Sequence, residues 1–143
     1  MKNETQAAKE KISSSTFRGK KILIADDDEF MRFAIGHRLK EEGFQTVTAI
    51  DGGEAMEYLK KEKPDLVILD LMMPYVSGPE FLHQMQSRYE PERRAPVIII
   101  SAIDQQELKD GGYKLEGYHF IRKPFTLDEL VHAVNHILAY GNN

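Results

Sequence analysis

The chain has 143 residues, of which 41% are hydrophobic and 29% charged, so its length and composition fit one globular domain with its own core. Its 19 basic and 23 acidic residues give a formal net charge of −4, which offers no basic surface for nucleic acid or an anionic membrane. The sequence contains no cysteine, and this excludes disulfides, thiolate catalysis and cysteine-based zinc sites. Its longest apolar runs are only a few residues long, so we expect no membrane span and a cytoplasmic protein.

The N-terminal residues 1–19 are polar and include few large apolar side chains, so we expect a flexible extension. From residue 20 onward, patterns typical of strands and helices alternate, with no internal repeat and no low-complexity linker. We therefore predict one domain over 20–140, followed by a short tail at 141–143.

Five short runs are predicted strands. The runs at 66–69 and 97–100 are wholly apolar, which is typical of strands buried on both faces of a sheet. The runs at 21–25 and 118–121 are short and largely apolar, and the run at 44–50 alternates and is rich in β-branched residues.

A helical pattern follows each predicted strand. After the first strand, Met31, Ile35 and Leu39 recur at a spacing of four residues, and Gly43 can end that helix. The last helix, from Leu127 to Leu138, has the clearest amphipathic pattern.

Three predicted helices open with a capping-box pattern, in which a small polar residue is followed three positions later by glutamate. The pairs are Asp51 with Glu54, Ser77 with Glu80, and Thr126 with Glu129. Strict alternation of strands and helices requires crossover connections and predicts an α/β fold, with a doubly wound, five-stranded parallel sheet and five helices.

Polar residues stand at the carboxyl ends of the predicted strands, where α/β sheets bind their ligands. Asp26, Asp27 and Asp28 follow the first strand, and Asp70 ends the third. Ser101 ends the fourth, and the dipeptide 123–124, Lys-Pro, follows the fifth. We expect these side chains to meet at one rim of the sheet.

The charges of these side chains limit the ligands and reactions that the rim can support. Converging carboxylates repel one another, so a divalent cation, Lys123 or both must hold them, and an oxygen-only ligand set favours Mg²⁺. An aspartate beside Mg²⁺ can attack a phosphoryl group, and Asp70 is the best candidate because its strand is the most buried. Lys123 and Ser101 can contact the phosphoryl oxygens, while Asp28 is predicted to cap the first helix rather than bind metal.

Four motifs at this rim occur together in one known family. They are ILIADDDEFMR, VILDLMMPYVSG, VIIISA and FIRKPF. The chain resembles, over roughly residues 20–140, the receiver domain of bacterial two-component response regulators, in the stand-alone form typified by chemotaxis regulators. The resemblance implies a flavodoxin-like sheet with strand order 2-1-3-4-5.

The resemblance also implies a role for each motif residue. The roles are an acidic metal-binding pair at Asp26 and Asp27, a phosphoacceptor at Asp70 that also contacts the metal, a backbone carbonyl ligand at Met72, a switch hydroxyl at Ser101, a switch aromatic at Phe120, and a phosphate-binding lysine at Lys123. The bond between Lys123 and Pro124 is expected to be cis. The implied metal is Mg²⁺, with Mn²⁺ as a substitute.

The function implied is a phosphorylation switch rather than an enzyme. A sensor histidine kinase or a phosphotransfer protein would phosphorylate Asp70, and a downstream effector protein would read the result, since no effector sequence follows residue 140. A homodimer through the face of the fourth helix, fifth strand and fifth helix is a further expectation. Nucleic acid and membranes are not expected partners.

A phosphatase of the haloacid-dehalogenase type is the alternative, because Asp26-x-Asp28 fits that family's nucleophile motif. Against it, the usual Thr or Val is absent from the motif, a cap domain does not fit the length, and Asp70 is left unexplained. A flavin-binding flavodoxin shares the strand order, but three aspartates in place of its phosphate loop would repel phosphate.

Two further features are weaker. The segment from Asp104 to Leu115 carries Gly111 and Gly112 in its middle, and each glycine costs about 1 kcal/mol relative to alanine in a helix interior. We expect a short, labile helix there that partners contact. His132 and His136 lie off the apolar face of the last helix, so a solvated surface is favoured over a metal site.

Overall fold

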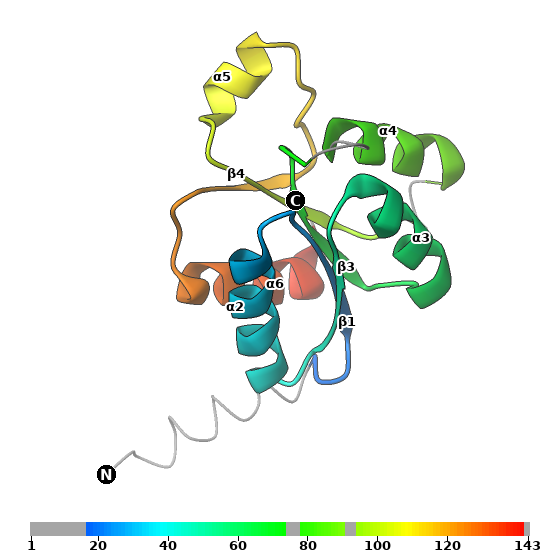
Figure 1. Cartoon of the computed structure of the whole chain (residues 1–143), viewed down its shortest axis with the longest axis vertical. Helices are drawn as coiled ribbons and strands as arrows, with labels where there is room; N and C mark the ends of the chain where they lie inside the picture. The colour runs from blue at the N-terminus through cyan, green and yellow to red at the C-terminus, as the bar shows by residue number, and fades with distance from the viewer. Residues whose placement is uncertain (1–16, 74–77, 91–93, 142–143) are drawn as a thin grey trace.

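The computed structural model describes residues 17–73, 78–90 and 94–141 (Figure 1). Within these ranges the elements are, in chain order, β1 (Lys21–Ala25), α2 (Glu29–Glu41), β2 (Gln45–Ala49), α3 (Gly52–Glu62), β3 (Leu66–Asp70), α4 (Gly78–Arg88), β4 (Val97–Ser101), α5 (Gln105–Asp110), β5 (His119–Arg122) and α6 (Leu127–Tyr140). Residues 1–16 of the predicted extension, Ser77 of the second capping pattern and residues 142–143 of the predicted tail lie outside the described residues.

The sheet is parallel throughout and has the order β2-β1-β3-β4-β5. Every residue of β3 and β4 is buried, as their wholly apolar runs predict. The predicted doubly wound α/β fold and its strand order are therefore confirmed. No helix of the described ranges has the length and apolar character needed to cross a membrane.

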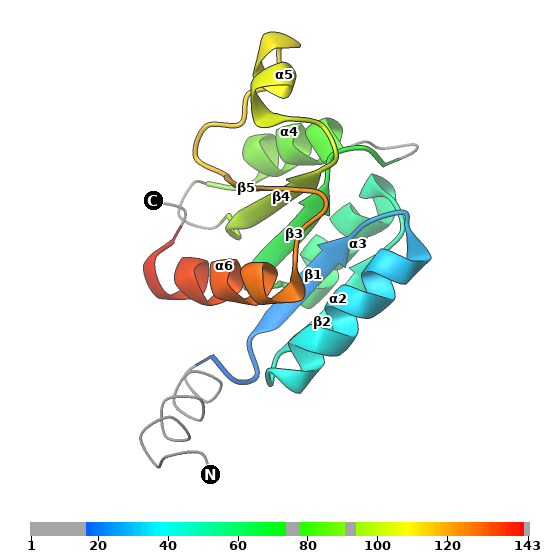
Figure 2. The same cartoon turned by 90° about the vertical axis from the view of Figure 1, so that its left-hand side faces the viewer.

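Two hydrophobic clusters sandwich the sheet. Alternate residues of the central strands face α3 and α4 on one side, together with Leu108 of α5. The other residues of these strands face α2 and α6, as Figure 2 shows for the two helices that lie across that side. The carboxyl ends of the central strands are thereby held between two packed layers.

The predicted caps are present where the structure describes them. Asp28 accepts hydrogen bonds from backbone N–H groups in the first turn of α2. Asp51 accepts one from the Glu54 N–H, and Thr126 accepts one from the Glu129 N–H. These bonds satisfy N–H groups that have no partner inside the helix.

Helix α2 ends as Gly43 predicts. Gly43 has φ +97°, a left-handed conformation that glycine adopts without strain. Its N–H donates to the Lys40 carbonyl and the Phe44 N–H donates to the Leu39 carbonyl, which is a Schellman arrangement.

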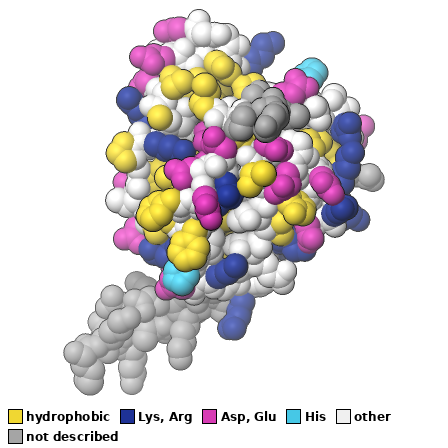
Figure 3. Space-filling view, in the orientation of Figure 1, with side chains coloured by type: hydrophobic (Ala, Val, Ile, Leu, Met, Phe, Trp, Pro, Cys, Tyr) yellow, Lys and Arg dark blue, Asp and Glu magenta, His cyan; other side chains and the backbone are white. Residues whose placement is uncertain are grey.

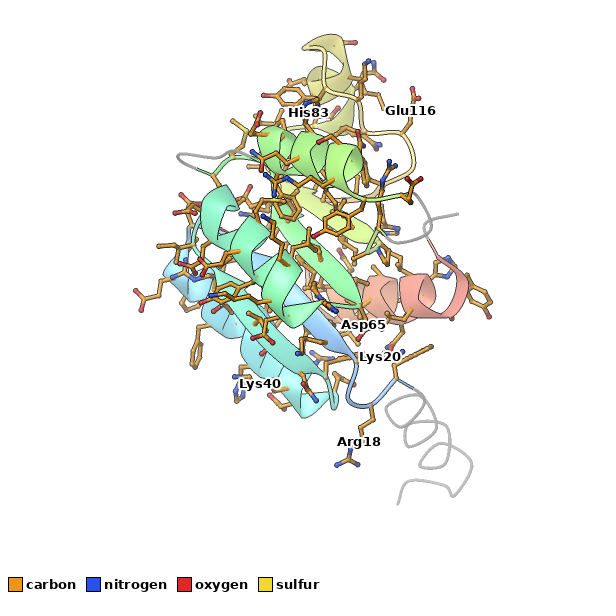
Figure 4. The ribbon with its side chains drawn as sticks, turned by 90° about the vertical axis from the view of Figure 1, so that its right-hand side faces the viewer. Arg18, Lys20, Lys40, Asp65, His83 and Glu116 are labelled. Carbon is orange, nitrogen blue, oxygen red and sulfur yellow. The ribbon has the colours of Figure 1, made fainter. Side chains whose placement is uncertain are left out.

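The amino ends of β1 and β3 lie at the edge of the sheet opposite the predicted rim. Lys20 Nζ and Asp65 Oδ1 are 4.0 Å apart there, and Figure 4 shows these side chains below α3 and α4, which lie side by side. The Asp65 carboxylate also accepts a hydrogen bond from the Lys21 N–H at 2.8 Å. These contacts tie the start of β1 to the residue that precedes β3.

Helix α5 has only six residues. It ends at Asp110, and Gly112 turns the chain with φ +95° before Leu115 returns to the core. The prediction of a short helix followed by a loop is confirmed, whereas a helix continuing from Asp104 to Leu115 does not form.

Candidate functional site

Three polar side chains are buried in the described part of the chain, and all three lie at the carboxyl ends of central strands. Asp26 and Ser101 have no exposed surface, and Asp70 is 5% exposed. They follow or end β1, β4 and β3, which are neighbours in the parallel sheet. Parallel register therefore brings them to one rim, as the sequence predicts.

Lys123 joins the two buried carboxylates. Its Nζ lies 3.2 Å from Asp26 Oδ2 and 3.3 Å from Asp70 Oδ2. The other oxygen of each carboxylate is also used, because Asp26 Oδ1 accepts the Asp28 N–H at 2.9 Å and Asp70 Oδ1 accepts the Met72 N–H at 3.0 Å. One ammonium thus bridges residues 97 and 53 positions away in the chain.

Burial and charge oppose each other at this bridge. Burial raises the pKa of Asp26, and the Asp70 charge raises it further, while the Asp28 N–H and Lys123 lower it; the net shift is upward. Burial lowers the pKa of Lys123, but Asp70 and Asp26 together outweigh it and raise that pKa. The rim therefore holds more negative charge than one lysine neutralises.

Asp27 completes an acidic group. Asp26, Asp27 and Asp70 each offer a carboxylate oxygen, and these oxygens lie within 4.8 Å of one another. Asp27 is exposed while the other two are buried, so the group is open to solvent on one side. In Figure 3, acidic side chains gather near the middle of this face around a basic one. An all-oxygen, open group of this kind fits Mg²⁺, which keeps several water ligands.

The remaining predicted residues lie on the strands beside this group. Ser101 Oγ accepts the Ile103 N–H at 3.0 Å, and the Lys123 N–H donates to the Ser101 carbonyl at 2.8 Å. The peptide bond between Lys123 and Pro124 is cis. Phe120 is half-buried on β5, so its ring lies between the core and the surface of the edge strand.

Gly78, the first residue of α4, packs against the backbone that follows β3, a role that the sequence analysis did not assign. A Cβ at Gly78 would lie 2.5 Å from the Leu71 Cα and 2.9 Å from the Asp70 carbonyl oxygen, both backbone atoms that cannot move aside. The Gly78 N–H also donates to the Leu71 carbonyl at 3.1 Å. Only glycine allows α4 to pack this closely behind the aspartate, and the G that ends VILDLMMPYVSG was the available signal.

Arg32 is a second residue that the sequence analysis missed. Its Nη1 donates to the Asp26 carbonyl at 2.7 Å and so ties the first turns of α2 to the end of β1. Nothing in the sequence singles out this arginine among the chain's other basic residues, because the contact depends on the fold.

The comparison with protein families decides what this rim is. The model of the response regulator receiver domain matches residues 22–135. The chain belongs to the response regulator receiver domain family. The match includes every rim residue described above.

Curated relatives agree with this assignment. The Bacillus subtilis alkaline phosphatase synthesis transcriptional regulatory protein PhoP is 34% identical over 119 residues, which are 83% of this chain and 48% of the relative. The Mycobacterium tuberculosis transcriptional regulatory protein PdtaR is 33% identical over 116 residues, 80% of this chain and 55% of the relative. The chain therefore spans about half the length of these relatives.

Solved structures give the same result. The receiver domain of Francisella response regulator 1452 has a TM-score of 0.75 and 35% identity, and the match covers 85% of this chain and 98% of that one. The Vibrio cholerae chemotaxis protein CheY4 has a TM-score of 0.71 and 29% identity, and the match covers 83% of this chain and 98% of that one.

Membership settles the broad class. Receiver domains are phosphoacceptor switches rather than conventional enzymes, they generally bind Mg²⁺ through an acidic pocket, and they interact with histidine kinases and effector domains. The haloacid-dehalogenase alternative based on Asp26 is not supported.

Proposed function

We propose that Asp70 of this receiver accepts the phosphoryl group and that the chain acts as a two-component switch in the cytoplasm. The observation that carries this proposal is the bridge of Lys123 Nζ to Asp26 and Asp70, at 3.2 and 3.3 Å. Asp70 is the one of these two carboxylates that ends a strand and is not fully buried, so an incoming phosphoryl group can reach it.

The transfer needs the negative charges on both sides to be neutralised. The Asp70 carboxylate attacks phosphorus, a new O–P bond forms, and the bond from phosphorus to the donor's leaving group breaks, with that group keeping the electron pair. Lys123 is placed to turn its ammonium toward the transferred oxygens. When bound by Asp26, Asp27, Asp70 and the Met72 carbonyl, Mg²⁺, or Mn²⁺ in its place, supplies positive charge to the same oxygens.

The switch follows from the hydroxyl of Ser101. In the described structure this hydroxyl is turned to its own loop, where it accepts the Ile103 N–H. A phosphoryl oxygen on Asp70 offers a charged acceptor on the neighbouring strand, which favours rotation of the hydroxyl toward it. The loop between β4 and α5 then follows, and the half-buried Phe120 ring is free to take the space that it leaves.

The proposed partners are those that the resemblance to the family implies. A sensor histidine kinase or a phosphotransfer protein supplies the phosphoryl group at the rim. A downstream effector, or a second copy of the chain in a homodimer, contacts the α5–β5–α6 face, which includes Phe120. The proposal includes no nucleic-acid or membrane partner, in keeping with the net charge of −4.

Intact-mass spectrometry tests the assignment of Asp70. The wild-type chain with acetyl phosphate and Mg²⁺ should gain the mass of one phosphoryl group, and Asp70→Asn should gain none. Asp110→Asn is the matched control, because Asp110 is exposed at the end of α5, and it should behave like wild type. Stable phosphorylation of Asp70→Asn at the wild-type rate would refute the proposal.

A further inference from the structure

Three of the five histidines of the chain lie around one surface hollow, away from the acidic rim. His119 on β5 and His132 and His136 on α6 line this hollow, which has a volume of about 760 Å³. Strand β5 is one of the two edge strands of the sheet and lies beside α6 (Figure 2). The sequence shows His132 and His136 as one helical turn apart, but the third histidine joins them only through the fold.

Among the described residues, none of the three imidazoles has a hydrogen-bond or ion-pair partner. Within the described part of the chain, His119 and His132 have no hydrogen bond or ion pair, and His136 has only a ring contact with Tyr140 at 5.2 Å. His37 on α2 behaves differently, since it pairs with Glu41 at 2.8 Å and stacks on Phe33. The nitrogens of the hollow are therefore available to a ligand.

The other charges of the hollow are paired, with one exception. Asp128 is bound by Arg38 at 2.6 Å, and Arg122 is bound to Asp104 at 3.3 Å. The carboxylate of Glu129 lines the hollow and has no ion pair with any residue that the structure describes. One free carboxylate and three free imidazoles thus remain on the same surface.

The spacing of these groups matches that of metal-binding helices. Glu129, His132 and His136 stand at positions i, i+3 and i+7 of α6, which lie on one stripe of a helix. Glu-x-x-His and His-x-x-x-His pairs bind metal ions from helices in other proteins. Burial of His119, together with the nearby His136 and His132, lowers the pKa of His119, so its imidazole is neutral at neutral pH, as a ligand must be.

We propose that His119, His132, His136 and Glu129 form a second metal site, specific for a borderline transition-metal ion such as Zn²⁺ and separate from the aspartate rim. Imidazole and carboxylate ligands suit Zn²⁺, which binds four ligands in a tetrahedron. Among the described residues, only the three aspartates form a group of three whose ligand atoms already lie within 4.8 Å of one another. Binding at the histidines therefore requires their side chains to rotate toward the ion. His132 and His136 are exposed, and the one contact to be released in the described structure is that of His136 with Tyr140.

The site has a functional consequence if the proposed switch is correct. Phe120 lines the same hollow, so a bound ion joins β5 to α6 beside the switch aromatic. Metal binding itself does not depend on phosphorylation, and Asp70→Asn should bind the ion as well as wild type does.

Isothermal titration of tag-free full-length chain with Zn²⁺, in excess Mg²⁺ to occupy the rim, tests the site. Wild type should bind one Zn²⁺ per chain, and His119→Gln, His132→Gln and His136→Gln should each bind it at least about tenfold more weakly. His83→Gln is the matched control, because His83 is exposed on α4, on the other face of the sheet (Figure 4), and it should match wild type.

Imidazole NMR provides the second readout, and in it Zn²⁺ should shift the resonances of the three histidines alone. Equal affinity in wild type and all three variants would overturn the site. So would equal weakening by His83→Gln, or loss of Zn²⁺ binding in Asp70→Asn or Asp27→Asn, since the ion would then lie elsewhere or on the aspartate rim.

Discussion

The aspartate rim and the α5–β5–α6 face differ in how firmly the fold holds them. The rim residues end or follow the central strands β1, β3 and β4, and Asp26, Asp70 and Ser101 are buried between two packed layers. The other face is built on the edge strand β5, which has four residues, and on α5, which has six. Leu108 is the one buried residue of α5.

This difference indicates that phosphoryl transfer and partner binding are assigned to different parts of the domain. Phosphoryl transfer needs charges held in fixed positions, because misplaced groups lose their stabilisation of the transition state. A partner-binding surface needs two arrangements of similar free energy, so that a small local change can shift the population. The most buried strands therefore carry the proposed acceptor, and the short helix α5 borders the surface that we propose partners contact.

The largest expected effect is a loss of phosphorylation when the metal ion is removed from the aspartate rim. With a chelator present, the carboxylates of Asp26, Asp27 and Asp70 face an anionic donor with Lys123 as their single counter-charge, so phosphorylation by acetyl phosphate should slow by about a hundredfold or more. The rate is measured by intact mass against time. Adding Mg²⁺ in excess of the chelator should restore it, and phosphorylation that proceeds at full rate in the chelator would show that the rim needs no ion.

A smaller effect concerns the stability of the rim without its ion. The pKa of Asp26 is raised above 3.8, chiefly by burial, so the folded chain holds this proton more tightly than the unfolded chain does. The proton thus stabilises the fold below pH 3.8, and this contribution is lost as the pH rises through the raised pKa. At neutral pH the ionised Asp26 carboxylate therefore lowers the free energy of unfolding.

Asp26→Asn should therefore raise the free energy of unfolding at neutral pH by on the order of 1 kcal/mol when a chelator is present. It should also flatten the pH dependence between pH 3.8 and neutral pH. Urea unfolding at several pH values measures both. Mg²⁺ should stabilise wild type and leave the variant unchanged, and a variant less stable than wild type in chelator would contradict the assigned cost.

The smallest expected effect concerns the α5–β5–α6 face and is a change in the stability of α5 at its C-terminal end. Gly111 has φ −80°, and an added Cβ would meet its nearest atom at 3.4 Å, so Gly111→Ala should stabilise this segment by about 0.4–1 kcal/mol. Gly112 has φ +95°, which alanine adopts only under strain, so Gly112→Ala should destabilise it. Amide exchange over 105–110 measures both, and equal effects of the two substitutions would show that backbone conformation does not limit α5.

Much of the fold could be predicted because the decisive signals are local. Alternating strand and helix patterns fix a parallel sheet, and the caps at Asp28, Asp51 and Thr126 depend on neighbours within a few residues. The expectation that both glycines interrupt α5 in the same way was incomplete, because the sequence does not show that only Gly112 has a positive φ.

The rim could be predicted because parallel strands bring their carboxyl ends together, whatever the details of packing. Contacts that depend on the details of packing could not be predicted from the sequence. The close approach of Gly78 to the backbone of residues 70–71, the bond from Arg32 to the Asp26 carbonyl, and the meeting of His119 with the histidines of α6 all join segments whose distance apart only the folded chain sets.

Amide hydrogen exchange with and without beryllofluoride and Mg²⁺, which together mimic the acyl phosphate, tests the separation of chemistry from readout most directly. The account predicts that exchange changes most over 101–122, which spans Ser101, α5 and Phe120, while β2 and α3 change little. Ser101→Ala should bind the mimic and lose most of that change. A change confined to the rim in wild type, or an undiminished change in Ser101→Ala, would contradict the account.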